Sequence, residues 1–89
     1  MKAVITVIGK DTVGILASVS TKCAEHSINV SDVTQSVLQE MFCMIMVCDI
    51  EKIDIPFGEF ADMMASYGKE RGLDIRVMHE DIYNSMHKI

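Results

Sequence analysis

The residues with the greatest potential for chemistry lie in one glycine-containing turn, Gly9 to Leu16, with the sequence GKDTVGIL. Its glycines can adopt a positive φ or admit another group close to the backbone, and Thr12 or Asp11 can cap the first free amides of a following helix. Such amides favour a carboxylate, while Asp11 or Asp32 favours an ammonium group. The turn is therefore a candidate site for a small zwitterion.

Catalysis requires a set of catalytic side chains at suitable spacing, and we find no such set in this sequence. Asp11 and Asp32 could act as an acid–base pair, but each also fits an ordinary turn or cap, and no nucleophile signature accompanies them. The histidines and cysteines show neither His-x-x-x-His nor Cys-x-x-Cys spacing, which argues against a metal site. The turn lacks both common phosphate-binding glycine patterns, and Asp11 would repel phosphate. We expect no enzyme activity, no metal and no cofactor.

The composition describes a small, acidic domain that is rich in apolar residues. The chain has 89 residues, a formal net charge of -5 and 49% hydrophobic residues, so we expect one domain over residues 1–89. The negative charge opposes nonspecific binding to nucleic acid or to an anionic membrane. Neither a signal sequence nor a membrane span is evident, and the odd number of cysteines predicts reduced core thiols. Together these features predict a cytoplasmic protein. The cysteines are Cys23, Cys43 and Cys48.

Hydrophobic patterning predicts six main elements in the order βαββαβ, followed by a tail. The expected strands are Lys2–Ile8, Asn29–Leu38, Phe42–Ile50 and Asp74–His79, and the expected helices are Val13–His26 and Pro56–Arg71. Residues 2–79 form the expected core, and residues 80–89 form a helical tail. Gln39, Glu40 and Met41 should make the reversal of a hairpin between the second and third strands.

The second predicted helix has clear boundary signals. Pro56 suits its first turn, and Gly72 suits its end. Gly58 and Gly68 inside it each cost roughly 1 kcal/mol relative to Ala. Close packing on the sheet would offset that cost.

The third predicted strand is apolar on both faces, because both alternating sets of Phe42 to Cys48 are hydrophobic. Two helices cover only one face of a sheet, so we expect another copy of the chain to cover the other and form at least a dimer. The alternative explanation of the apolar excess is a core rich in methionine. The tail could dock on that other face or on a partner, and we expect it to dock on a partner. An RNA-recognition module shares the βαββαβ order but needs exposed aromatic residues, of which these strands offer only Phe42.

The element order, the turn Gly9 to Leu16 and the segment Ile28 to Asp32 together resemble the ACT domain, over Lys2 to about His79. The chain is similar to small stand-alone bacterial ACT proteins and to the ACT modules of glycine-cleavage regulators. The resemblance implies an α+β ferredoxin-like sandwich with antiparallel sheet order 4-1-3-2 and two helices on one face. It also implies dimers with ligands, commonly amino acids, at subunit interfaces.

Carried over by position, the resemblance implies a ligand set in the turn and at the start of the second strand. The alternative is structural: Gly14 as a turn hinge, Asn29 as a helix-exit residue and Asp32 as a solvated strand residue. The implied set is Asp11, Thr12, Val13, Gly14, Ile15, Asn29, Val30, Ser31 and Asp32.

The resemblance leads us to expect a non-catalytic regulatory domain that senses an amino acid at a homo-oligomer interface. ACT domains typically regulate a catalytic or DNA-binding domain on the same chain, and none is expected here, so the regulated protein would be a separate one. The alternative function is a ligand-free protein–protein interaction module that acts through its sheet face and its C-terminal tail.

Overall fold

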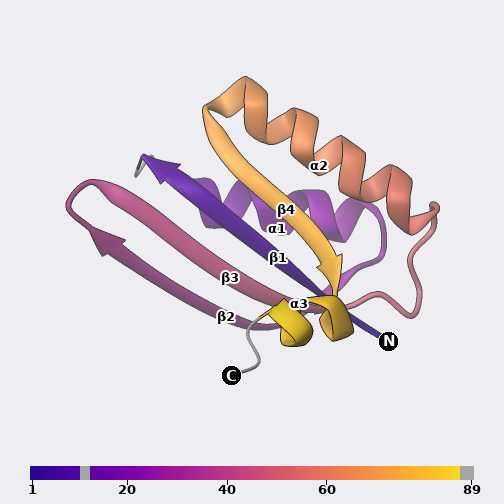
Figure 1. The fold of residues 1–89 in the computed structure, drawn as a ribbon. Coiled ribbons are helices and arrows are strands. Elements are labelled where there is room, and N and C mark those ends of the chain that lie inside the picture. Colours follow the sequence, from indigo (N-terminus) through magenta and orange to yellow (C-terminus); the bar gives the residue numbers. More distant parts are fainter. Residues whose placement is uncertain (11–12, 87–89) are drawn as a thin grey trace.

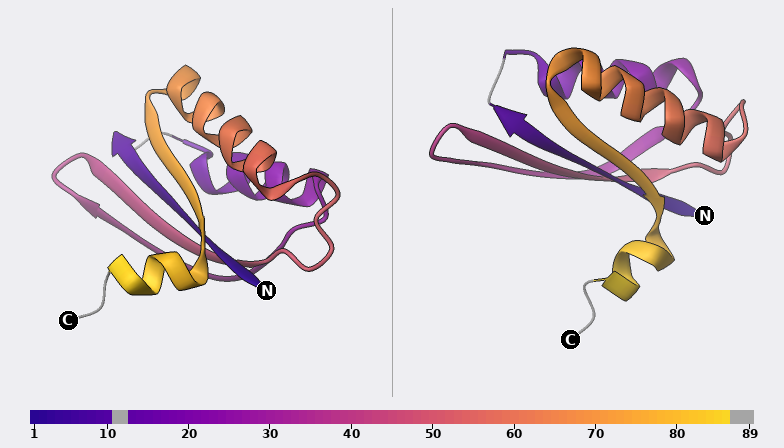
Figure 2. Two further views of the ribbon diagram at one scale, coloured as in Figure 1. Left: turned by 45° about the vertical axis from the view of Figure 1, so that its right-hand side comes forward. Right: turned by 45° about the horizontal axis from the view of Figure 1, so that its top comes forward.

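A computed structural model describes residues 1–10 and 13–86. Two helices cover one face of a single sheet, and a short C-terminal helix lies on the other face (Figures 1 and 2). The elements are β1 (Lys2–Lys10), α1 (Ile15–Glu25), β2 (Asn29–Leu38), β3 (Met41–Asp49), α2 (Phe57–Arg71), β4 (Leu73–His79) and α3 (Glu80–Met86). The predicted α+β ferredoxin-like fold is confirmed.

The sheet has four strands in the order β2-β3-β1-β4, and every neighbouring pair is antiparallel. This order is the expected 4-1-3-2. The β2–β3 hairpin is tighter than predicted, because Leu38 pairs with Met41 and leaves only Gln39 and Glu40 in the loop. Both loop residues have a positive φ, 55° and 68°, as a two-residue hairpin of this kind requires.

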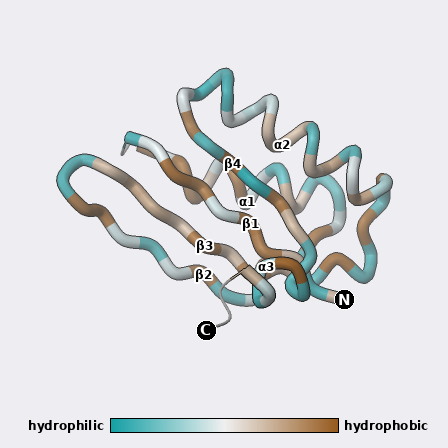
Figure 3. Tube along the Cα trace, in the orientation of Figure 1, coloured by the Kyte–Doolittle hydropathy of each residue, from teal (hydrophilic) through white to brown (hydrophobic). Residues whose placement is uncertain are grey.

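The core lies between the sheet and helices α1 and α2. Alternate residues of β1 and β3 point to this side, which matches the two-residue period of a strand. Both central strands are strongly hydrophobic (Figure 3). Methionine fills much of the core, which accounts for part of the apolar excess in the sequence. The largest fully buried side chains include Phe60, Ile5, Met44, Met46 and Met64.

Gly9 belongs to β1 rather than to the turn that follows it. It pairs with Phe42 on one side and with Leu73 on the other, so β1 continues two residues beyond the predicted end. A Cβ atom at Gly9 would lie 2.6 Å from Leu73 Cδ2. Of the two roles that the sequence allows for a glycine here, a positive φ or the close approach of another group, Gly9 has the second, because the absence of a side chain permits close packing against β4.

The C-terminal tail docks on its own sheet. Helix α3 packs against β1 and β4 on the face opposite α1 and α2 (Figure 2), which corrects our preference for a partner. Val4 points to this face and is only 1% exposed, whereas Ile8 on the same face is 41% exposed. The tail therefore covers part of the open face and leaves the rest accessible. The part of the predicted tail formed by residues 87–89 lies outside the described residues.

The two glycines inside α2 have opposite surroundings. A Cβ at Gly68 would lie 2.7 Å from the carbonyl oxygen of Leu73 and 2.9 Å from Ile75 Cγ1, whereas a Cβ at Gly58 meets nothing within 4 Å. Close packing on the sheet therefore explains Gly68 but not Gly58.

This contrast gives a matched pair of variants. Gly68→Ala should lower the free energy of unfolding by about 1–3 kcal/mol, because the methyl group forces α2 away from β4. Gly58→Ala should raise it by about 0.5–1 kcal/mol through helix propensity. Urea denaturation followed by circular dichroism measures both values, and equal effects at the two positions would contradict the packing argument.

Candidate functional site

The glycine turn is built around Gly14, which precedes the first residue of α1. Gly14 has φ 85° and ψ 11°, in the left-handed region, and its carbonyl accepts the first helical hydrogen bond from Ser18 N at 2.9 Å. A Cβ at Gly14 would meet nothing within 4 Å. The positive φ, rather than crowding, is therefore what requires glycine in this conformation.

The turn presents backbone groups to solvent. Val13 is 99% exposed, whereas Ile15 is 2% exposed and its side chain belongs to the core. The helix begins at Ile15 and not at the predicted Val13, so its first amides lie beside an open surface with the positive end of the helix dipole. Asp11 and Thr12 lie outside the described residues.

The second part of the expected ligand set lies at the start of β2. Asn29, Ser31 and Asp32 are exposed, whereas Val30 packs against the core. A register shift between Val30 and Asp32 makes Ser31 an extra residue, and Ser31 Oγ accepts a hydrogen bond from Lys2 Nζ at 3.2 Å. Asp32 Oδ1 accepts a hydrogen bond from Val33 N at 2.9 Å. The side chains that could contact a ligand here are therefore those of Asn29, Ser31 and Asp32.

One chain does not bring these two segments together. Asn29 pairs with Asp49, which pairs with Lys2, whereas Leu38 pairs with Met41, which pairs with Lys10 at the other end of the sheet. The length of β1 separates these ends by about 26 Å. The two segments of the implied ligand set therefore do not meet within a single chain, and β2 neighbours β3 rather than β1.

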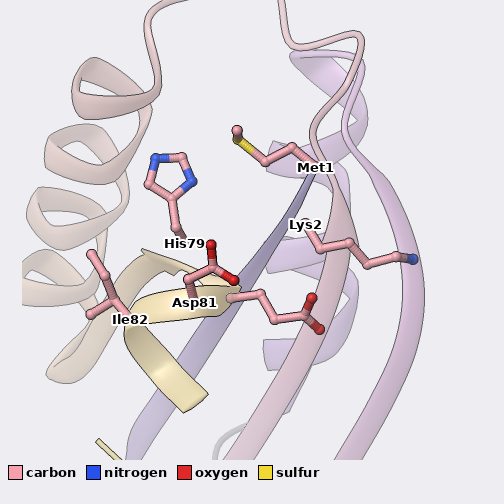
Figure 4. A pocket seen from close by; sticks show the side chains of 6 residues that line it. Met1, Lys2, His79, Asp81 and Ile82 are labelled. Carbon is pink, nitrogen blue, oxygen red and sulfur yellow. The ribbon is translucent and has the colours of Figure 1, made fainter. Parts of the chain in front are cut away.

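A cavity that sequence reasoning missed lies at the Asn29 end of the sheet. Its volume is about 530 Å³. Figure 4 shows His79 and Met1 beside the same space, while Lys2 extends away toward β2. The pairing of Ala3 with His79 brings the N-terminus beside the start of α3, so only knowledge of the sheet order could have revealed this cavity. The lining residues are Met1, Lys2, His79, Glu80, Asp81 and Ile82.

The imidazole beside this cavity packs against an aromatic ring. The His79 ring stacks on Phe57 with a centroid distance of 4.1 Å and an interplanar angle of 22°. Its Nδ1 is buried without a hydrogen-bond partner among the residues that the structure describes. The cavity thus combines the acidic side chains of Glu80 and Asp81 with the ring of His79.

Two of the three thiols are closed off from solvent. Cys23 and Cys48 are 0% exposed in the core, as predicted, whereas Cys43 is partly exposed on the open face. The hydrogen bond with the Cys23 thiol, together with burial, raises the pKa of the Cys48 thiol far above its ordinary value. A thiol in this environment is a poor nucleophile. Within residues 1–10 and 13–86 no group of three or more His, Cys, Asp or Glu side chains is placed to hold a metal ion.

The geometry, a βαββαβ sandwich with a glycine turn before α1, places the chain in the ferredoxin-like class of α+β domains. The ACT domain family profile matches residues 2–78. The chain belongs to the ACT domain family. A UPF0237 protein of Listeria monocytogenes is 46% identical over 89 residues and covers 100% of both chains. A UPF0237 protein of Methanopyrus kandleri is 41% identical over 88 residues, which cover 99% of this chain and 98% of that protein.

Solved structures agree with this assignment. An ACT domain protein from Streptococcus pneumoniae has a TM-score of 0.81 and 36% identity, with 93% of each chain covered. A putative glycine cleavage system transcriptional repressor has a TM-score of 0.71 and 19% identity, over 85% of this chain and 43% of that chain, which shows the fold alone. The relatives include archaeal proteins, so the family is broader than the expected bacterial group. In the described part of the chain, no helix has the length and apolar character needed to cross a membrane.

The conformation of Gly14 predicts a graded series of variants. Gly14→Ala should lower the free energy of unfolding by about 1–2 kcal/mol, because an L side chain is strained at positive φ. Gly14→Val should cost more, because it is β-branched, and Gly14→Asn should cost least. Urea denaturation measures the order, and a Val variant as stable as wild type would show that our account of the turn is wrong.

Proposed function

We propose that this protein is a non-catalytic regulatory domain that binds an amino acid at an interface between two copies of the chain. One wall of the site is the turn, Asp11 to Ile15, of one copy. The other wall is Asn29 to Asp32 of the second copy. The observation that supports this arrangement is the placement of the two segments at opposite ends of the same sheet.

The edge strand β2 offers a way to join two copies. It has 10 residues, lies at the edge of the sheet, and contains neither proline nor lysine, which commonly protect such edges. If two β2 strands pair antiparallel about a two-fold axis, the Asn29 end of one copy lies beside the Leu38 end of the other. The Leu38 end is where the turn follows Lys10. Pairing would therefore bring the two separated walls together.

The chemistry of the joined walls suits an amino acid. The amides at the start of α1 and the positive end of its dipole favour the carboxylate. Asp32 is exposed and can accept a hydrogen bond from the ammonium group. Gly14 leaves open space in front of the backbone. Helix α1, which packs against β2, would lie close to the joined edge and place its first turn there.

The proposed output is regulation of a separate protein in the cytoplasm. A ligand that completes the interface binds the paired state better than the single chain, and it therefore shifts the population toward the pair. Core thiols such as Cys23 and Cys48 are compatible with a reducing compartment.

The open sheet face supports a second candidate function, that of a ligand-free module for binding another protein. Exposed apolar residues gather on this face, where Ile8 is 41%, Leu38 75% and Met41 48% exposed. A pull-down that recovers one partner protein in stoichiometric amount would favour this function over the first, provided that no amino acid binds the protein.

The interface predicts a specific effect on assembly. Wild-type protein should be at least a dimer at micromolar concentration in light scattering. Thr34→Lys should weaken that dimer by about tenfold or more, because Thr34 lies near the middle of β2 and its lysines would repel across a two-fold axis. Ser66→Lys on the exposed surface of α2 adds the same charge and should leave the dimer intact. A monodisperse wild-type monomer would contradict the proposal.

The ligand prediction is tested by a thermal-shift panel of the common amino acids. A ligand at 100 times its Kd should stabilise the protein by about 2.7 kcal/mol, which raises Tm by several degrees. Gly14→Val and Thr34→Lys should both reduce this shift, whereas Ser66→Lys should not. The absence of any shift across the panel, in a protein that is folded and dimeric, would overturn amino-acid sensing while leaving the dimer in place.

A further inference from the structure

A second cavity lies on the open face of the sheet, between the strands and α3. Its volume is about 330 Å³, within the range of small-molecule sites. Apolar side chains of the central strands, Ile8 and Ile45, form one wall together with Met78 of β4, and Tyr83 and Met86 of α3 also line it. The cavity is on the opposite side of the sheet from α1 and α2 (Figure 2). We call it the open-face groove.

Among the residues that the structure describes, the rim of the open-face groove carries one cation and one anion. Arg76 and Asp74 both line it, and Arg76 Nε lies 3.3 Å from Asp74 Oδ1. Their side chains are 68% and 55% exposed, so the pair is largely solvated and contributes little to stability. Both groups are therefore available to a ligand at little cost.

We propose that the open-face groove is a separate binding site for a free amino acid with an apolar side chain. The guanidinium of Arg76 takes the carboxylate, Asp74 takes the ammonium group, and the side chain of the ligand packs on Ile45 and Met78. The site does not depend on the interface proposed above, because its described lining groups all come from one copy of the chain.

Charge complementarity selects a zwitterion over simpler ligands. A lone carboxylate on Arg76 would meet Asp74 only 3.3 Å from the guanidinium, in a chain of net charge -5. A lone amine on Asp74 would meet the guanidinium in the same way. An entirely apolar molecule would cover the charged rim without replacing its hydration. Only a ligand with both charges and an apolar body satisfies the whole groove.

Cys43 provides a built-in reporter for this site. Its thiol lines the groove and is partly exposed, whereas Cys23 and Cys48 are 0% exposed in the core. A water-soluble aromatic disulfide reagent should therefore react with one thiol per folded chain, and a ligand in the groove should slow that reaction. Cys43→Ser should abolish the fast reaction, which establishes the source of the signal.

The experiment measures the rate of Cys43 modification in the presence of L-leucine, L-methionine and L-phenylalanine. We expect at least one of them to slow the reaction about fivefold or more at saturation, with L-glutamate and octanoate without effect. Arg76→Gln and Asp74→Asn should each raise the apparent Kd by about tenfold or more. Arg71→Gln, which removes the same charge from the surface of α2, should not change it. Gly14→Val should leave the protection intact, which separates this site from the turn.

Three results would overturn the proposal. Protection by octanoate alone would assign the groove to fatty carboxylates. Slow labelling that becomes fast on dilution, with no effect of any amino acid, would show that a second copy of the chain covers this face. Protection that survives in both Arg76→Gln and Asp74→Asn but is lost in Gly14→Val would place the ligand at the turn.

Discussion

The apolar character of both faces of the central strands is the constraint on which the rest of the structure depends. On one face, Ile5 and Met46 are sealed by α1 and α2. On the other, Val4 is buried while Ile8 is not, because α3 is too short to cover the whole sheet. Helices α1 and α2 therefore bury one face of the sheet completely. The second face keeps a groove with a polar rim.

Much of the fold could be predicted because it depends on local periodicity. The alternation in β1 and β3 and the helical spacing that brings Phe60 and Met64 to one side specify the element order and the core. The positive φ at Gly14 was also accessible from sequence, since a glycine before a helical pattern is a strong turn signal. The two-residue hairpin loop was harder to predict, because Gln39 and Glu40 adopt positive φ angles that Asn and Gly usually adopt in such loops.

The candidate site was less predictable because residues that are close in the sequence can lie far apart across the sheet. Asn29 follows α1 closely along the chain, yet α1 carries the chain back along the sheet and places Asn29 far from Gly14. The cavity beside His79 depends on the pairing of β1 with β4, which joins the two ends of the described chain. Residues that meet only through long-range strand pairing leave no local pattern to recognise.

The extra residue Ser31 in β2 has a further consequence for the outer edge of the sheet. It lets Val30 and Val33 both face the core although they are three residues apart, so the strand changes phase between them. Only Asp32 to Leu38 then presents an uninterrupted ladder of backbone groups to an added strand. A strand displaced by one residue along this edge would exchange its inward and outward side chains. The extra residue thus marks the Asn29-side end of the stretch with which a joining strand can pair.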